Sequence, residues 1–198
     1  MKTTAAMVAA LAGVASARNL NSALTLSKRE VPQEKSHQNI LDVVNPLLKE
    51  DNPLEIVDAV FALLGNKAAA EGAPNVQNLD CLQQIIADQV FTTAKAKGDL
   101  EGQANAIVFR ALERNTGSVG LESVLCSGIT AVNPEIAAIT QHQDPASDAG
   151  KSGNAAIELA VAAQLSAIGF DPLFALQSAT FPPGEVSYFP NAPPTSEK

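Results

Sequence analysis

The chain has 198 residues, of which 13 are Lys or Arg and 21 are Asp or Glu, so its formal net charge is −8. A surface this acidic repels phosphate groups, and we expect neither nucleic-acid binding nor attraction to anionic membranes. Two cysteines, no tryptophan and a hydrophobic share of 46% fit a single globular domain and argue against a zinc site built on cysteine.

The N-terminal residues predict a route through the secretory pathway. An apolar run followed by small residues is typical of a signal peptide, residues 1–17, which is cut after Ala17. The apolar run is shorter than the roughly 20 residues that a membrane-spanning helix needs. Lys28-Arg29 would then end a propeptide, residues 18–29, at a site for a dibasic-specific protease of the same pathway.

Past this leader, we expect one helical domain between two irregular ends. Cleavage after Lys28-Arg29 would remove four basic and no acidic residues, which brings the net charge to −12. Tyr188 and Phe189 near the C-terminus would either bind a partner or fold back over the domain. The predicted division is a flexible segment at residues 30–38, a helical domain at 39–180 and a proline-rich tail at 181–198.

Asx-Pro pairs recur along the predicted domain and indicate helix starts. An Asx side chain at the N-cap accepts backbone N–H bonds, and proline fits the next position because its missing N–H has no helical partner there. The stretch 52–55, Asn-Pro-Leu-Glu, also places Glu three residues after the cap, as in a capping box. The pairs begin at Asn45, Asn52, Asn133, Asp144 and Asp171.

Apolar residues at helical spacing predict an all-α bundle of about six to eight helices. No stretch shows the alternation and turns of a β-hairpin. Gly98 is expected to end one helix and Asp99 to cap the next, which Gly117 would end. The expected helices cover about residues 40–47, 56–72, 79–97, 99–116, 121–126, 135–141, 154–168 and 172–176, and a loop is expected at 144–153.

Cys81 and Cys126 are expected to form a disulfide. An even number of cysteines in an oxidising compartment favours pairing, and the alternative is two buried free thiols. In the chain-entropy model, a bridge that closes about 45 residues contributes about 4 kcal/mol. It would join the start of the third expected helix to the end of the fifth.

No residue pattern predicts a catalytic, cofactor or metal site. His37 and His142 each lack a second histidine at metal spacing, and a pair of His142 with Asp144 lacks a positioned nucleophile. Helix caps and dipoles explain carboxylates such as Asp99 and Glu101. The absence of tryptophan also counts against a polysaccharide hydrolase. We therefore expect a protein that is not an enzyme and that uses no cofactor.

Polar residues along the fourth expected helix allow two interpretations. They would either form a recognition surface or pair with one another at i, i+3 and i, i+4 spacing on a solvated face, and the second interpretation is favoured. The residues are Gln103, Asn105, Arg110, Glu113 and Arg114.

The layout of leader, dibasic site, two cysteines and acidic, alanine-rich helical domain resembles that of small secreted cell-wall proteins of fungal spores. Residues 102–115, GQANAIVFRALERN, carry the resemblance in sequence. It implies a secreted, non-enzymatic component of the conidial wall, whose partners are wall components or other surface proteins. Such a protein would organise the spore surface and mask it from host immune recognition.

Two alternatives remain open from the sequence. Aliphatic residues on several helix faces, such as Ile85 with Ile86 and Leu159 with Val161, would suit a carrier that holds a lipid or sterol between helices. A host-directed effector would share the size, leader and cysteine use of a wall protein. No segment is expected to span a membrane.

Overall fold

The computed structural model of the protein describes residues 37–180. The predicted signal peptide with Ala17, the dibasic site Lys28-Arg29 and the proline-rich tail lie outside the described residues. The N-terminal segment at 30–38 is described from His37 onward, where it enters the first helix.

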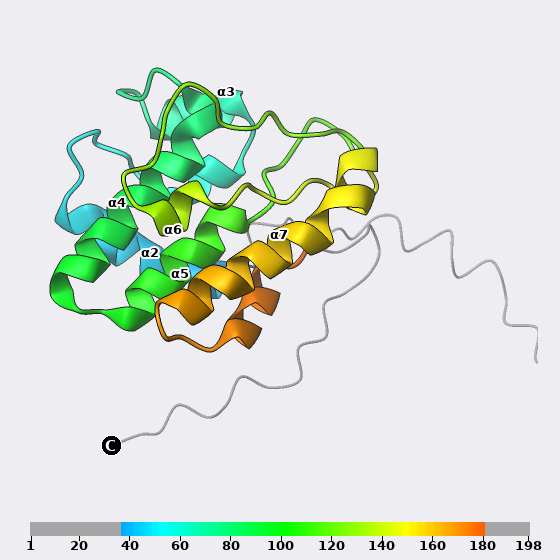
Figure 1. Ribbon diagram of the computed structural model, residues 1–198. Helices are drawn as coiled ribbons and strands as arrows, with labels where there is room; N and C mark the ends of the chain where they lie inside the picture. The colour runs from blue at the N-terminus through cyan, green and yellow to red at the C-terminus, as the bar shows by residue number, and fades with distance from the viewer. Residues whose placement is uncertain (1–36, 181–198) are drawn as a thin grey trace, which may run out of the picture.

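The described part of the chain is all-α, as predicted, and contains no β-strand. The helices pack around one hydrophobic core (Figure 1). No helix among residues 37–180 combines the length and the apolar character that crossing a bilayer would require. The elements are α2 Gln38–Glu50, η3 Ala59–Leu63, α3 Asn66–Gly72, η4 Leu79–Cys81, α4 Leu82–Lys97, α5 Leu100–Ala111, α6 Pro134–Ala137, α7 Asp148–Ala167 and η5 Pro172–Ser178.

An antiparallel pair, α4 and α5, forms the centre of the molecule. Gly98 ends α4 in the left-handed conformation (φ 68°), and Asp99 caps α5 by accepting the Gly102 N–H at 2.8 Å, both as predicted. Because α2, α4, α7 and η5 all contact α5, nearly every α5 side chain is buried, including Ile107 and Phe109. The shared core of this pair therefore positions everything that lies on the outer face of α4.

The single helix expected over residues 56–72 is not formed, and two shorter helices take its place. Asn52 does not cap a helix. Its side chain accepts the Ile56 N–H at 2.9 Å and donates to the Ile56 carbonyl at 2.8 Å. This closes a tight turn, in which Glu55 takes a left-handed φ of 53° that a helix cannot continue. Asp58 instead caps the short 3-10 helix η3 by accepting the Val60 N–H, and α3 follows separately.

Three expected helix boundaries and one expected helix in the stretch 111–154 are also wrong. The fourth expected helix ends at Ala111 rather than near Gly117, and α6 ends at Ala137 rather than at 141. The expected helix at 121–126 is absent, and the segment is irregular. The long helix α7 begins at Asp148, within the expected loop, because Ser147 accepts the Gly150 N–H and caps it.

Gly98 and Gly153 give a matched test of this local analysis. Gly98→Ala places a Cβ in a left-handed conformation and should lower the free energy of unfolding by roughly 1 kcal/mol. Gly153→Ala lies inside α7 with open space around the added Cβ, and it should raise that free energy by about as much. Urea unfolding measures both changes. Equal signs for the two substitutions would contradict the assignment of Gly98 as the helix-ending residue.

Candidate functional site

Residues 112–133, which we call the clamped loop, cross the outer side of α4 without forming a helix (Figure 1). The predicted disulfide is confirmed: Cys81 and Cys126 are bonded, with their Cα atoms 4.4 Å apart. Cys81 ends η4, immediately before α4, while Cys126 lies in the clamped loop and not at the end of a helix as expected. The bridge therefore attaches the middle of the loop to the first residues of the central helix pair.

Side-chain amides hold the backbone of the loop next to the bridge. The Gln143 side chain accepts the Ser123 N–H at 2.7 Å and donates to the Ser123 carbonyl at 3.1 Å. Asn78 donates to the Ser127 carbonyl at 2.9 Å. Because these amides take over hydrogen bonds that a helix would have made internally, the loop stays extended despite the helical spacing of its aliphatic residues.

Arg110 orients two further amides toward the loop. Its guanidinium donates to the Oε1 atoms of Gln84 and Gln141, each at 3.3 Å. Both Nε2 groups are thereby turned outward, where Gln84 donates to the Ile129 carbonyl and Gln141 to the Val124 carbonyl, each at 2.9 Å. The buried arginine thus determines which loop carbonyls can be bound.

Arg114 joins three separate segments beneath the same loop. It donates to the Ala62 carbonyl at 3.1 Å and to Oδ1 of Asn66 at 2.8 Å, and its Nη1 lies 3.8 Å from a carboxylate oxygen of Asp80. A longer contact of 3.5 Å reaches the Val124 carbonyl. One side chain therefore links η3, α3, η4 and the clamped loop.

Burial shifts the acid–base properties of both guanidinium groups. Desolvation, followed by repulsion from Arg114, lowers the pKa of Arg110 to about 10. Desolvation also lowers the pKa of Arg114, while the nearby Asp80 carboxylate raises it. Hydrogen bonds to carbonyl and amide oxygens compensate for the burial of both groups, although the Nε atom of Arg110 has no acceptor among the described residues.

The favoured interpretation of the polar residues of the fourth expected helix is wrong, because they are not on a solvated face. Asn105, Arg110, Glu113 and Arg114 are buried, and Gln103 is half-buried and donates to the Asp99 carbonyl. The neighbouring residues in the sequence indicate that these polar side chains are buried. The stretch 104–112 is almost entirely apolar, so no face of the helix there is polar enough to meet solvent.

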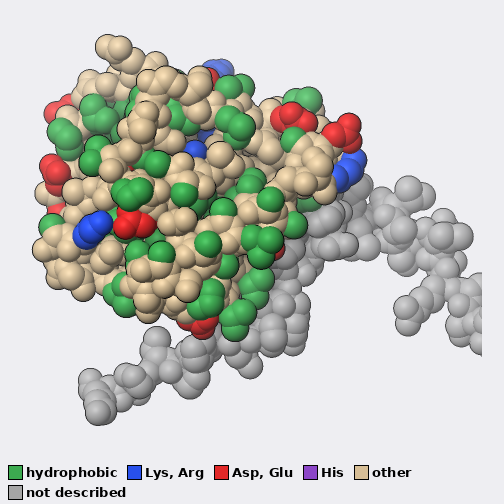
Figure 2. Space-filling view, in the orientation of Figure 1, with side chains coloured by type: hydrophobic (Ala, Val, Ile, Leu, Met, Phe, Trp, Pro, Cys, Tyr) green, Lys and Arg blue, Asp and Glu red, His purple; other side chains and the backbone are tan. Residues whose placement is uncertain are grey.

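The outer surface of the clamped loop is apolar and nearly uncharged. Between Asn115 and Asn133, Glu122 is the one charged residue. Figure 2 shows hydrophobic side chains spread over this face with few charged groups between them. Six large aliphatic side chains in the loop are between 39% and 86% exposed: Val119, Leu121, Val124, Leu125, Ile129 and Val132.

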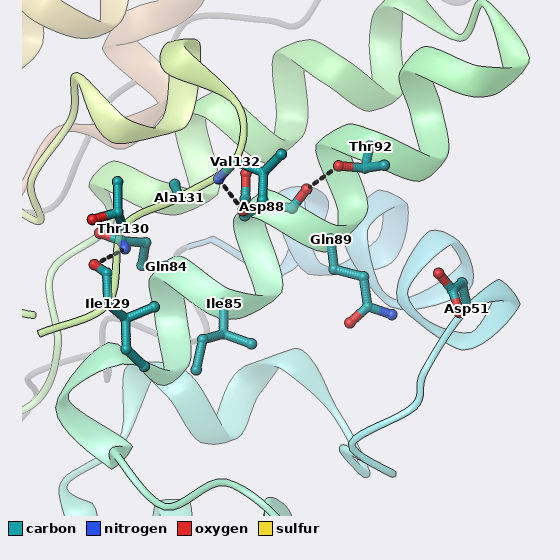
Figure 3. A pocket seen from close by; sticks show the side chains of 10 residues that line it. All are labelled: Asp51, Gln84, Ile85, Asp88, Gln89, Thr92, Ile129, Thr130, Ala131 and Val132. Carbon is teal, nitrogen blue, oxygen red and sulfur yellow. Dashed lines mark hydrogen bonds between the residues drawn. The ribbon is translucent and has the colours of Figure 1, made fainter.

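An open cleft of about 390 Å³ lies between α4 and the strip 129–132 of the clamped loop (Figure 3). Asp88 on α4 fixes one wall by accepting the N–H groups of Val132 and Asn133, at 2.7 and 2.9 Å. The lining combines aliphatic side chains, amides, hydroxyls and two carboxylates. The residues are Asp51, Gln84, Ile85, Asp88, Gln89, Thr92, Ile129, Thr130, Ala131 and Val132.

His142 and Asp144 bond backbone groups in the structure. The His142 ring is buried and its Nδ1 lies 2.7 Å from the Ala111 carbonyl, to which it donates. The Asp144 carboxylate accepts the N–H groups of Gly120 and Ala146. Residues 37–180 hold no cluster of three or more His, Cys, Asp or Glu that could bind a metal ion. The His142 ring thus binds the last residue of α5. The Asp144 carboxylate binds the clamped loop at Gly120 and the segment before α7 at Ala146.

The aliphatic pairs considered for a lipid carrier divide between core and surface. Ile86 and Val161 are buried in the core, Leu159 is 72% exposed on α7, and Ile85 lines the cleft. The cleft also contains carboxylate and amide groups, so its chemistry suits a polar ligand better than an acyl chain.

Comparison with known proteins finds no matching protein-family model, and neither the curated proteins nor the solved structures contain a significant match. The clamped loop and the adjacent cleft are therefore the candidate site on geometry alone. Their disulfide could be predicted from the two cysteines. Gln84, Asp88 and Gln141 could not be, because their helical or loop positions carry no motif.

Removing the disulfide should loosen the clamped loop before it affects the helix pair. The double variant Cys81→Ala/Cys126→Ala loses a cross-link between residues 45 apart, so we expect up to about 4 kcal/mol less stability in urea unfolding. Hydrogen exchange should increase most in residues 112–133, while the α4–α5 core stays protected. Equal deprotection of α5 and the loop would contradict a local role for the bridge.

His142 should make the protein less stable in mild acid. Burial lowers the pKa of His142 below its ordinary value, so the unfolded state binds the proton more readily. Stability contributed by the neutral ring is complete above about pH 6.5 and is lost as the pH falls through the lower pKa of the folded state.

The measurement is urea unfolding at pH 7.5 and pH 5.5 for the wild type and His142→Asn, whose amide can still donate toward the Ala111 carbonyl. The variant should lose less stability between the two pH values. Identical losses would contradict the prediction.

Proposed function

We propose that this protein is a secreted, non-catalytic interaction protein of the fungal cell surface, which binds its partner through the clamped loop. The observation that carries the proposal is the gathering of six exposed aliphatic side chains in one loop with a fixed backbone. Large aliphatic side chains left exposed along one nearly uncharged segment favour a protein interaction site.

The rigidity of the loop supports a binding role. A loop that must be ordered on binding loses affinity to conformational entropy, whereas a loop ordered in advance does not. The disulfide and the amides of Gln84, Gln141 and Gln143 order the loop when the chain folds, before any partner binds. The exposed side chains of Val124 and Leu125 are then available to a partner at little further cost.

The predicted leader and the acidic charge support the location. A secreted chain with a net charge of −12 after processing would stay dispersed through mutual repulsion until it meets its partner. The resemblance of residues 102–115 to spore-wall proteins favours wall components or other surface proteins as that partner. On a spore, a layer of such proteins would organise the surface and cover it from host immune recognition.

Loss of two loop side chains should weaken wall binding. We expect Val124→Ser/Leu125→Ser to reduce retention of the full chain on isolated fungal spore walls about tenfold, because two partly exposed aliphatic groups no longer become buried. The matched control is Leu159→Ser/Leu173→Ser, which removes two leucines outside the loop that are more exposed than Val124 and Leu125. A cosedimentation assay at several protein concentrations gives both affinities.

The location is tested in the same material. An antibody raised to residues 30–198 should stain intact spores after detergent washing. Staining confined to the medium, or equal retention of the loop variant and its control, would contradict the proposed function.

A further inference from the structure

Gln89 is the first indication that the cleft beside the clamped loop takes a ligand. Its side chain lies in the cleft between Ile85 and Asp51 (Figure 3). The Nε2 atom is buried, and no residue in the described part of the chain accepts a hydrogen bond from it. A buried amide without an acceptor is costly, and a rotation of the side chain toward the open cleft would let Nε2 meet the carbonyl oxygen of a ligand.

The other amide and carboxylate of α4 in the cleft are already occupied. Both oxygens of Asp88 accept bonds from the backbone N–H groups of Val132 and Asn133. Gln84 uses Oε1 for Arg110 and Nε2 for the Ile129 carbonyl. Among the described lining residues, this leaves the Gln89 amide and the Asp51 carboxylate to meet a ligand, with Thr130 at the other end of the cleft, next to Gln84 (Figure 3).

Aliphatic side chains complete the cleft. Ile85 is half-buried, and Ile129 and Val132 are 39% and 86% exposed on the facing strip. The cleft thus offers an amide with both a donor and an acceptor, an aliphatic surface and an exposed carboxylate. A carboxamide can pair with a peptide bond at both its N–H and its C=O, while the other two groups suit an aliphatic and a basic side chain.

The charge of the domain favours a basic ligand. Residues 37–180 contain seventeen acidic and seven basic residues, and two of the seven, Arg110 and Arg114, are buried. Three of the five lysines pair with carboxylates, in Lys95–Glu135, Lys97–Glu50 and Lys151–Asp148. None of the basic residues among 37–180 lines the cleft. An acidic ligand would be repelled, whereas a basic one would be attracted over a long range.

We propose that the cleft between α4 and residues 129–132 binds an extended, basic peptide segment of a partner protein. A backbone amide of the segment pairs with Gln89, an aliphatic side chain packs on Ile85 and Ile129, and a Lys or Arg pairs with Asp51. The inference deepens the proposed function and rests on it: the surface partner that meets the clamped loop presents such a segment beside it.

The test is fluorescence polarisation with the full chain and a labelled hexapeptide of alternating leucine and lysine. Gln89→Met, which keeps the size but removes the amide, should weaken binding about tenfold, and Asp51→Asn about fivefold. Glu101→Gln is the matched control, because it removes one exposed negative charge outside the cleft and should leave the affinity within twofold. A leucine–glutamate hexapeptide should not bind.

Three outcomes would overturn the inference. Wild-type affinity of Gln89→Met would show that the amide meets no peptide bond. Equal weakening by Glu101→Gln and Asp51→Asn would reduce the effect to the overall charge of the domain. Displacement of the peptide by a neutral chitin oligosaccharide at a lower concentration than by unlabelled peptide would assign the cleft to a glycan.

A separate arm distinguishes this inference from the proposed function. Val124→Ser/Leu125→Ser lies outside the cleft and should bind the hexapeptide like the wild type. If that variant also keeps its wall retention while Gln89→Met loses peptide binding, the wall function fails and the peptide cleft stands. If the loop variant loses wall retention but Gln89→Met binds peptide normally, the cleft inference fails and the wall function stands.

Discussion

The buried guanidinium of Arg110 is the constraint on which the outer half of the molecule depends. It donates to the carbonyl oxygens of two glutamine side chains, and both amides can then donate outward to the clamped loop. A glutamine without such a neighbour could present either end to the loop. The arginine removes this choice, because a guanidinium has no acceptor and can pair with Oε1 alone. The path of the loop is therefore decided inside the core.

This arrangement explains how an irregular segment of more than twenty residues stays ordered on a helical core. A helix satisfies its own backbone groups, whereas an extended loop must find partners elsewhere. Here amides from α4 and from residues 141–143 supply them, and the disulfide reduces the entropy lost on folding. The aliphatic side chains of the loop are left facing outward because its inner side is occupied by polar contacts.

The sequence predicted the parts of the fold that depend on local rules. The left-handed Gly98, the cap at Asp99, the start of η5 at Asp171 and the disulfide were all predicted. Residues 121–126 could not be, because Leu121, Val124 and Leu125 have helical spacing and their competing partner, Gln143, lies twenty residues away from Ser123. Long-range side-chain bonds of this kind leave no periodic signal. The predicted helix cap at Asn52 was wrong for a related reason, since an Asx side chain can close a turn as readily as it caps a helix.

The candidate site could not be predicted, because the helical spacing of its residues is also typical of an ordinary solvated helix face. Residues 81, 84, 85, 88, 89 and 92 form one stripe along η4 and α4, opposite the apolar residues that enter the core. Such a polar stripe normally indicates a solvated face. In this protein the residues of the stripe have two roles. Cys81, Gln84 and Asp88 bind the clamped loop. Ile85 and Gln89, each one position further along the chain, line the cleft. Since the held strip 129–132 is itself a wall of the cleft, the cleft exists only while the clamp does, and a ligand that packs on Ile129 would in turn stabilise the clamped loop.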